Sequence, residues 1–208
     1  MTVEHVEFLV EEASMEAALA ILLPKILTRT TFRIHVHQGK PDLLGQLPQR
    51  LRGYAAWIPA TWRIVVVVDR DDEDCEELKR QLEDVAGQAG LITRLAARRT
   101  ANAASYVVVT RLAIEELEAW YFGDWEAVRA AYPRAPRTIP SKAPYRAPDA
   151  IRGGTHEALL RVLQQAGYFA GGLRKIEAAR AIAEHMEPSR NTSPSFRALR
   201  DALRDLEL

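Results

Sequence analysis

Acidic side chains gather at three points of this sequence where they could hold a divalent cation together. The three points come soon after three apolar runs, VEFLV, IVVVV and YVVV. The acids are Glu11, Glu12 and Glu16 in the first cluster, Asp69, Asp71, Asp72, Glu73 and Asp74 in the second, and Glu115, Glu116 and Glu118 in the third. Carboxylate oxygens are the ligands that Mg²⁺ prefers, and bound Mg²⁺ or Mn²⁺ can promote reactions at phosphate esters. The sequence therefore predicts a Mg²⁺ or Mn²⁺ site built from carboxylates.

The second cluster is the densest, because residues 69–74 contain five acids in six positions. In extended backbone, residues two apart point the same way, so we expect Asp69 and Asp71 to bind one cation together. A cation there would relieve the repulsion among these carboxylates. The alternative is a negatively charged helix start, which the helix dipole stabilises. That alternative explains residues 72–74 well, but it explains Asp69 less well, since this residue adjoins the apolar run.

The other two clusters leave more than one interpretation open. Glu11 ends a predicted strand, and Glu16, just inside the following helix, could reach the same point. Glu115 and Glu118 are three residues apart and would share one face of a predicted helix, with Glu116 turned aside. We expect one acid of this third cluster to face the metal. In both clusters the acids could instead be solvated.

Several other chemistries have no motif in this chain. The sequence contains no G-x-x-x-x-G-K-[ST], no G-x-G-x-x-G and no G-x-S-x-G. The single cysteine, Cys75, excludes a disulfide framework and a cysteine-based zinc site. His35 and His37 would share a strand face, but no third zinc ligand lies nearby, so we interpret them as ordinary strand residues.

Short apolar strands alternate with helical patterns in the first part of the chain. Strands are predicted at 6–10, 32–36, 64–68 and 106–109, and helices at 14–26 (capped by Ser14), 43–51, 76–86 and 114–122. The β-branched run 64–68 is typical of a central strand buried on both faces. This alternation predicts an α/β fold with a parallel sheet, in which working residues lie at the carboxyl ends of the strands. The acidic clusters fall at those ends.

The character of the chain changes after residue 132. Five prolines punctuate residues 133–148, and helical patterns resume at 155–165, 173–185 and 194–206, the last with Ser193 as its cap. We expect an α/β domain at 1–132, and a basic linker with a C-terminal helical extension packed on it at 133–208. The net charge is −6 over residues 1–128 and +6 over 129–208. This asymmetry fits a metal site beside a phosphate-binding surface, although charge also varies by chance along a chain.

Membrane insertion and secretion are not expected. No apolar stretch approaches the roughly 18 residues of a membrane helix. The N-terminus has no basic segment before an apolar one, so it does not match a signal peptide. We therefore expect a cytoplasmic protein.

The order Glu, then Asp-x-Asp, then Glu at three strand ends resembles the Toprim fold. Toprim is the metal-dependent catalytic domain of topoisomerases, primases and overcoming-lysogenization-defect nucleases. The typical first motif of that fold is Glu-Gly, and here Glu12 replaces the glycine. Because of this departure, the resemblance does not by itself imply primase or topoisomerase activity for this chain.

A narrower resemblance covers nearly the whole chain. It rests on the segments FLVEEASMEAAL, HQGKPDLLGQLPQRLRGY, VVDRDDEDCEELK, EELEAWYFGD, KIEAARAIAEHM and NTSPSFRAL. These segments resemble a Toprim-like bacterial family that is catalogued as a domain of unknown function (DUF 4276 type). The resemblance implies a Toprim-type nuclease acting on nucleic acid, with DNA as the favoured substrate. It also implies a setting in phage defence or DNA repair, beside an ATPase of the ABC/SMC type.

The resemblance also implies roles for particular residues. Glu11 becomes the catalytic acid or base and a metal ligand, Asp69 and Asp71 become the Asp-x-Asp metal pair, and the third cluster contributes Glu116 or, next, Glu118. Related nucleases place a lysine near the scissile phosphate, and here Lys175 is preferred over Lys40. Nucleic-acid contacts are expected at Lys40, Arg98, Arg99, Arg111, Lys142 and Arg174.

Two rival functions remain open at this stage. The first is a non-catalytic module that binds nucleic acid or a partner, with Trp120, Tyr121, Phe122 and Trp125 as a docking surface. The second is a small-molecule phosphohydrolase, because VVVVDRDDED resembles the D-x-D start of haloacid-dehalogenase-type phosphatases. In those enzymes the nucleophile normally lies on the first strand, whereas here two predicted strands come before Asp69.

Overall fold

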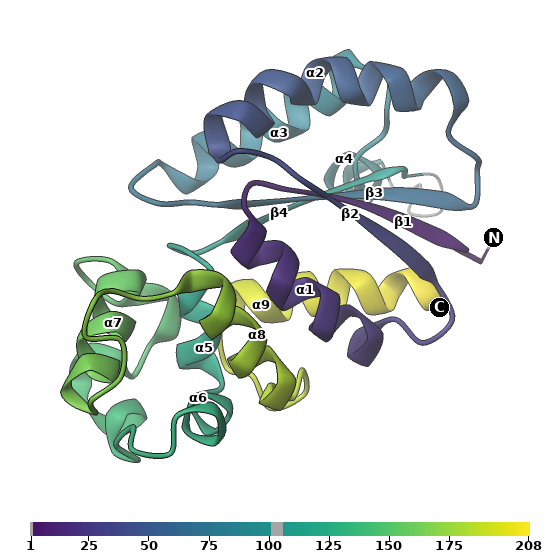
Figure 1. The fold of residues 1–208 in the computed structure, drawn as a ribbon. Helices are drawn as coiled ribbons and strands as arrows, with labels where there is room; N and C mark the ends of the chain where they lie inside the picture. The colour runs from purple at the N-terminus through teal and green to yellow at the C-terminus, as the bar shows by residue number, and fades with distance from the viewer. Residues whose placement is uncertain (1, 101–105) are drawn as a thin grey trace.

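Four apolar segments form a parallel sheet in the computed structural model, which describes residues 2–100 and 106–208. The strands are β1 (His5–Val10), β2 (Thr31–Val36), β3 (Trp62–Asp69) and β4 (Val108–Ala113), in the order β2-β1-β3-β4 (Figure 1). Every residue of β3 after Trp62 is buried, because β1 and β4 flank this strand and helices cover both faces of the sheet. This burial explains the absence of polar residues from IVVVV. The predicted α/β fold with a parallel sheet is confirmed.

Helices cover both faces of the sheet. Helix α1 (Ala13–Ile26) packs with Phe8, Val65 and Val67 on one face. Helices α2 (Lys40–Trp57) and α3 (Cys75–Gln88) cover the other face (Figure 1). Apolar residues at helical spacing supply the buried side of each helix, as with Leu43, Leu47 and Leu51 in α2. A short helix, α4 (Arg94–Arg99), precedes β4.

The chain after β4 is helical. Its helices are α5 (Glu118–Gly123), α6 (Trp125–Ala131), α7 (Thr155–Gln165), α8 (Lys175–His185) and α9 (Pro194–Arg204), with short 3₁₀ turns at Ile139–Ser141, Ala143–Tyr145, Pro148–Ala150 and Asp205–Glu207 (η5). Their apolar residues join those of β1 and α1 in one hydrophobic cluster. The helical segment is therefore packed against the sheet. Among the described residues, no helix is long and apolar enough to cross a membrane.

The four aromatic residues of α5 and α6 are part of this core. Trp120, Tyr121, Phe122 and Trp125 are all buried, so they do not form the docking surface considered above.

Helix α8 packs along α1, and this packing places the N-terminal end of α8 at the carboxyl end of the sheet. Lys25, near the end of α1, donates hydrogen bonds to the carbonyl oxygens of Ala183, Glu184 and Met186 at 2.8–2.9 Å. These carbonyls close the C-terminal end of α8, where a cation is favoured. At the opposite ends of the two helices, Lys175 begins α8 close to Glu12, which precedes α1. The two helices are thus parallel, and Lys175 lies at the carboxyl end of β1.

The segment NTSPSFRAL, which begins at Asn191, holds helices α5 and α9 together. The Asn191 side chain donates to the Trp120 carbonyl at 2.8 Å and accepts from the Ser193 amide at 2.9 Å. Ser193 caps α9 by accepting from the Phe196 amide, which confirms the predicted cap. A Cβ atom at Gly123 would lie 2.2 Å from Asn191 Oδ1, so only glycine allows this close approach.

Two predicted elements are wrong at the point where the third acidic cluster lies. Strand β4 runs over 108–113 and not 106–109, because its partner β3 continues to Asp69 and pairs that residue with Ala113. Helix α5 begins only at Glu118, since residues 114–117 form a bend. The predicted helix face shared by Glu115 and Glu118 therefore does not exist. Ser14 also does not cap α1, because the helix begins before it, at Ala13.

Candidate metal centre

Three elements bring buried carboxyl groups together at the carboxyl end of the sheet. Glu11 follows β1, Asp69 ends β3 and Glu118 begins α5, and these residues are only 6%, 3% and 4% exposed. Strands β1 and β3 are neighbours in the sheet, so the residues that end them emerge side by side. Charges on Glu11 and Glu118 both act on Asp69. The structure therefore gathers one acid from each predicted cluster.

The protonation of this cluster is strongly perturbed. Burial raises the pKa of Glu11 to about 7, although hydrogen bonding to Asp69 lowers it in part and the charge of Asp71 raises it further. Burial, followed by the charges of Glu11 and Glu118, holds the pKa of Asp69 well above its usual range. Carboxyl groups crowded in this way repel one another when ionised. A bound cation would remove that repulsion.

The donor atoms fit a hard divalent cation. The buried oxygens Glu11 Oε2 and Asp69 Oδ1 have no hydrogen-bond partner among the described residues. Within the same residues, no three His, Cys, Asp or Glu side chains are arranged as a group that could hold a metal ion as they stand. A third carboxylate would therefore have to rotate toward the Glu11–Asp69 pair. The oxygen chemistry suits Mg²⁺ or Mn²⁺.

A lysine and a tyrosine complete the surroundings of this cluster. Lys175 Nζ lies 3.5 Å from Glu12 Oε1. Burial alone would lower the Lys175 pKa, but the charges of Glu118, Glu12 and other nearby acids raise it, so the ammonium form is favoured. The buried Tyr121 hydroxyl has no partner among the described residues, and burial and the charge of Glu118 raise its pKa. The preferred catalytic lysine thus lies beside the acids.

The three acids of the third cluster have separate partners. Glu115 forms an ion pair with Arg70 at 2.9 Å. Glu116 accepts hydrogen bonds from the Thr155 hydroxyl at 3.1 Å and the His156 amide at 2.8 Å, at the start of α7. Glu118 Oε1 lies 3.2 Å from His156 Nδ1, and this hydrogen bond raises the pKa of the histidine. Glu118, and not the preferred Glu116, is therefore the acid of this cluster that acts most strongly on Asp69.

Asp71 departs from the predicted pairing with Asp69. The strand ends at Asp69, and Asp71 lies in a turn with φ of 51°, so the alternation of extended backbone no longer applies. Its exposed carboxylate pairs with Lys40 at 2.6 Å, and Lys40 also pairs with Glu73 at 2.8 Å. Lys40 is thereby held by the acidic turn. Asp71 still raises the pKa of Glu11, so it lies near the cluster.

A pocket of about 430 Å³ opens beside the acidic turn. Its lining includes Asp71, Asp72, Glu115, Glu116 and Glu157, together with Gly153 and Gly154 from the segment before α7. The sheet end and the helical segment therefore share one acidic opening.

The family of the chain follows from comparison with known proteins. The family described as a domain of unknown function (DUF4276) matches residues 10–204. The chain belongs to this family. No curated protein matches the chain. The DUF4276 chain is similar in structure to the C-terminal region of the Burkholderia pseudomallei OLD protein, with 16% sequence identity and a TM-score of 0.50 over 98% of each chain. At that identity the likeness shows the fold alone, and it confirms the predicted Toprim-like fold.

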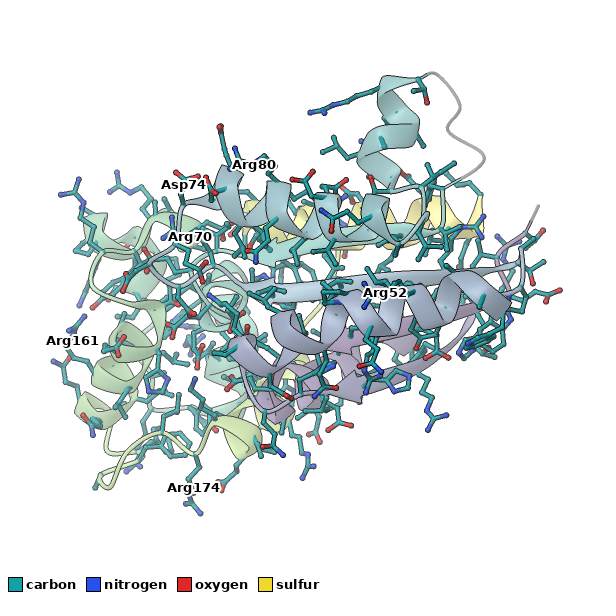
Figure 2. The ribbon with its side chains drawn as sticks, turned by 90° about the horizontal axis from the view of Figure 1, so that it is seen from above. Arg52, Arg70, Asp74, Arg80, Arg161 and Arg174 are labelled. Carbon is teal, nitrogen blue, oxygen red and sulfur yellow. The ribbon has the colours of Figure 1, made fainter. Side chains whose placement is uncertain are left out.

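The remaining predicted residues of the DUF4276 chain form no hydrogen bond or ion pair with the Glu11–Asp69 pair among the described residues. Glu16 is half-buried in the first turn of α1. Arg98 and Arg99 are on α4, and Arg111 is inside β4 and not at its end, because that strand runs to Ala113. Lys142 is exposed, and the exposed Arg174 pairs with Glu177 at 3.0 Å. Figure 2 shows Arg174 pointing outward from the helical segment.

Sequence reasoning missed two residues of the DUF4276 site. His156 contacts Glu118, which is 38 residues away in sequence. Tyr121 lies in a helix whose apolar residues indicate only that it is buried. No local motif marks His156. The one feature of the sequence that points to this region is the glycine pair 153–154. Both glycines have positive φ, and the turn that they form brings the start of α7 to the acidic cluster.

Proposed function

We propose that this chain is a Mg²⁺- or Mn²⁺-dependent nuclease that cleaves phosphodiester bonds in nucleic acid, with DNA as the favoured substrate. The observation that carries the proposal is the buried Glu11–Asp69 carboxyl pair, with Glu118 and Lys175 beside it. Buried acids with raised pKa values mark functional sites, because their burial costs stability unless a ligand compensates. The Toprim-like fold supports the same chemistry by resemblance.

Each residue has a role in this proposal. Glu11 and Asp69 would hold the cation, and Glu118 would join them, with Asp71, Glu116 and Glu16 as further acids within the region. A cation bound there would lower the pKa of a water molecule and stabilise the leaving oxygen. Lys175 keeps its proton and would neutralise charge on the scissile phosphate. His156 would orient Glu118 through the hydrogen bond at Nδ1.

Partners belong to the same proposal. Basic side chains of the helical segment would carry the nucleic acid, with Lys142 and Arg174 among them. An ATPase partner of the ABC/SMC type and a role in phage defence or DNA repair stay predictions from the family resemblance.

The experiment is a cleavage assay with Mn²⁺ or Mg²⁺ on single- and double-stranded DNA. We expect Asp69→Asn and Lys175→Ala to lose at least about 100-fold in rate, as when a charge-stabilising group is removed from an active site. The matched controls are Asp84→Asn, an exposed acid on α3, and Arg180→Ala on α8, which should retain activity. Equal activity of Asp69→Asn and wild type would overturn the metal assignment.

A further inference from the structure

A second polar pocket lies at the free edge of β4, apart from the acidic cluster. It measures about 70 Å³ and is lined by Lys79, Glu83, Arg94, Arg98, Thr110 and Arg111. These residues come from α3, α4 and β4. Thr110 and Arg111 lie within β4, whereas the acidic cluster lies beyond the carboxyl ends of the strands. The two sites therefore occupy different parts of the sheet.

The charges around this edge pocket do not balance. Glu83 pairs with Lys79 at 3.1 Å and accepts hydrogen bonds from the hydroxyl groups of Thr93 and Thr110. Asp205 pairs with Arg94 and lies 3.5 Å from Arg98. Four cations thus face two carboxylates. The excess of two positive charges equals the charge of a phosphate dianion.

Arg111 is the cation of this edge pocket that neither carboxylate pairs with. Among the described residues its guanidinium forms no ion pair or hydrogen bond, and its Nε atom is buried without a partner. Burial, and then repulsion from Arg94 and Arg98, lowers the Arg111 pKa to about 10. The Arg111 side chain is half-buried, and guanidinium groups withdrawn from water in proteins are normally paired with anions. The site is therefore electrostatically prepared for an anion.

We propose that this edge pocket binds one phosphate group, either as inorganic phosphate or as the phosphate of a monoester. Guanidinium groups suit phosphate oxygens because they donate parallel hydrogen bonds, and Arg98 and Arg111 are the donors with spare capacity. The small volume accommodates a single oxyanion and not a nucleoside. An adjoining space of about 180 Å³ shares Arg94 and Arg98 and reaches Tyr106, so a monoester could extend there. This proposal does not depend on the nuclease activity.

The test is calorimetric titration of the full chain with inorganic phosphate and, separately, with adenosine monophosphate. We expect a Kd of about 1 mM or tighter for at least one of them. Arg98→Ala should weaken binding about tenfold, whereas Arg99→Ala, the neighbouring arginine on α4, should leave it unchanged. Arg98 is 60% exposed, so its removal should not unfold the protein. Arg111→Lys keeps the charge but not the planar guanidinium, and should also weaken binding.

The outcomes separate this site from the metal centre. Asp69→Asn should retain phosphate binding, whatever its effect on cleavage. Tighter binding of the nucleotide would identify a monoester as the source of the phosphate, and tighter binding of inorganic phosphate would identify the free anion. No measurable binding of either probe, or equal weakening by Arg98→Ala and Arg99→Ala, would overturn the proposal.

Discussion

At the scale of single residues, the burial of the Glu11 and Asp69 carboxyl groups lowers the stability of the folded protein. Each carboxyl group is buried, and burial raises the pKa of both. A carboxyl group whose pKa is higher in the folded than in the unfolded protein destabilises the fold once the pH exceeds the unfolded value. The pair therefore costs folding free energy near neutral pH. The proposed cation site would offset this cost when it is occupied.

Replacing Glu11 by glutamine should stabilise the protein in the absence of divalent cations. The Glu11 pKa is raised from 4.5 to about 7, so ionisation of this group opposes folding across that interval, and a neutral amide removes the penalty. We expect the free energy of unfolding of Glu11→Gln to rise by about 1–3 kcal/mol at pH 7. Thermal unfolding with and without Mn²⁺ measures both this gain and the loss of stabilisation by the metal.

The control for this measurement is Glu76→Gln, an exposed acid in the first turn of α3. It should keep the stabilisation by Mn²⁺. If Mn²⁺ stabilises Glu11→Gln as much as wild type, Glu11 is not a ligand.

At the scale of elements, the C-terminal turn fastens one end of the molecule to the loop between α1 and β2. The Glu207 carboxylate of η5 accepts hydrogen bonds from the amides of Thr28, Arg29 and Thr30 and from the Thr28 hydroxyl, at 2.8–3.1 Å. Burial raises the pKa of Glu207, but these bonds outweigh burial and lower it to about 2. One ionised side chain thus holds two distant segments together.

This contact predicts a dependence of stability on pH. Because the Glu207 pKa is lower in the folded protein, its contribution is present above about 4.5 and is lost as the pH falls toward about 2. Glu207→Gln should cost about 1 kcal/mol at pH 6–7, a value reduced for solvent screening, and almost nothing at the acid end. Urea unfolding at several pH values measures the difference from wild type.

Glu184→Gln, an exposed acid on α8, is the control and should show no such trend. A pH-independent difference between wild type and Glu207→Gln would contradict the proposed role of the carboxylate charge.

At the scale of the whole molecule, the fold brings a basic surface to the acidic opening. The segment 134–161 carries exposed Arg134, Arg137, Lys142, Arg146, Arg152 and Arg161, and Glu157 is its exposed acid. The same segment lines the acidic pocket through Gly153, Gly154 and Glu157. Figure 2 shows Arg161 on the outside of the helical segment, far from Arg52 on α2. The segment 134–161 therefore places exposed basic side chains next to the acidic opening.

Neutralising this basic surface should weaken binding of DNA. In an Asp69→Asn background, which prevents the proposed cleavage, the triple variant Arg146→Ala, Arg152→Ala and Arg161→Ala should bind duplex DNA at least about tenfold more weakly. The slope of log K against log salt should become shallower by about 1–3, since fewer phosphates are contacted. Fluorescence anisotropy at several salt concentrations measures both quantities.

A charge-matched control removes three exposed arginines elsewhere, with Arg33→Ala, Arg52→Ala and Arg80→Ala. If both triple variants lose affinity equally, net charge and not this surface governs binding.

The sequence by itself determined the parallel sheet and the two acids at the ends of β1 and β3. Apolar β-branched runs require burial on both faces, and the acid that follows VEFLV or IVVVV marks the carboxyl end of that strand, whereas the threonine and arginine that follow YVVV still lie inside β4. The places of Glu11 and Asp69 at strand ends therefore follow from local rules that hold in any parallel sheet, and their metal-binding roles stay predictions. The preference for Lys175 rested on the family resemblance and on its place in the basic half of the sequence, and the structure then placed it beside Glu12.

Only the tertiary structure decided which acid of the third cluster acts most strongly on the pKa of Asp69. Residues 114–117 are not helical, and there Glu115 pairs with Arg70 and Glu116 binds the start of α7, partners that are not local in sequence. Long-range packing likewise placed His156 at Glu118 and brought the half-buried Arg111 near Arg94 and Arg98. The periodicity of apolar residues indicates which side of a helix or strand is buried. It does not indicate which residue, 38 or more positions away, will contact that side. That partner depends on how α7 and α8 pack, which no single segment encodes.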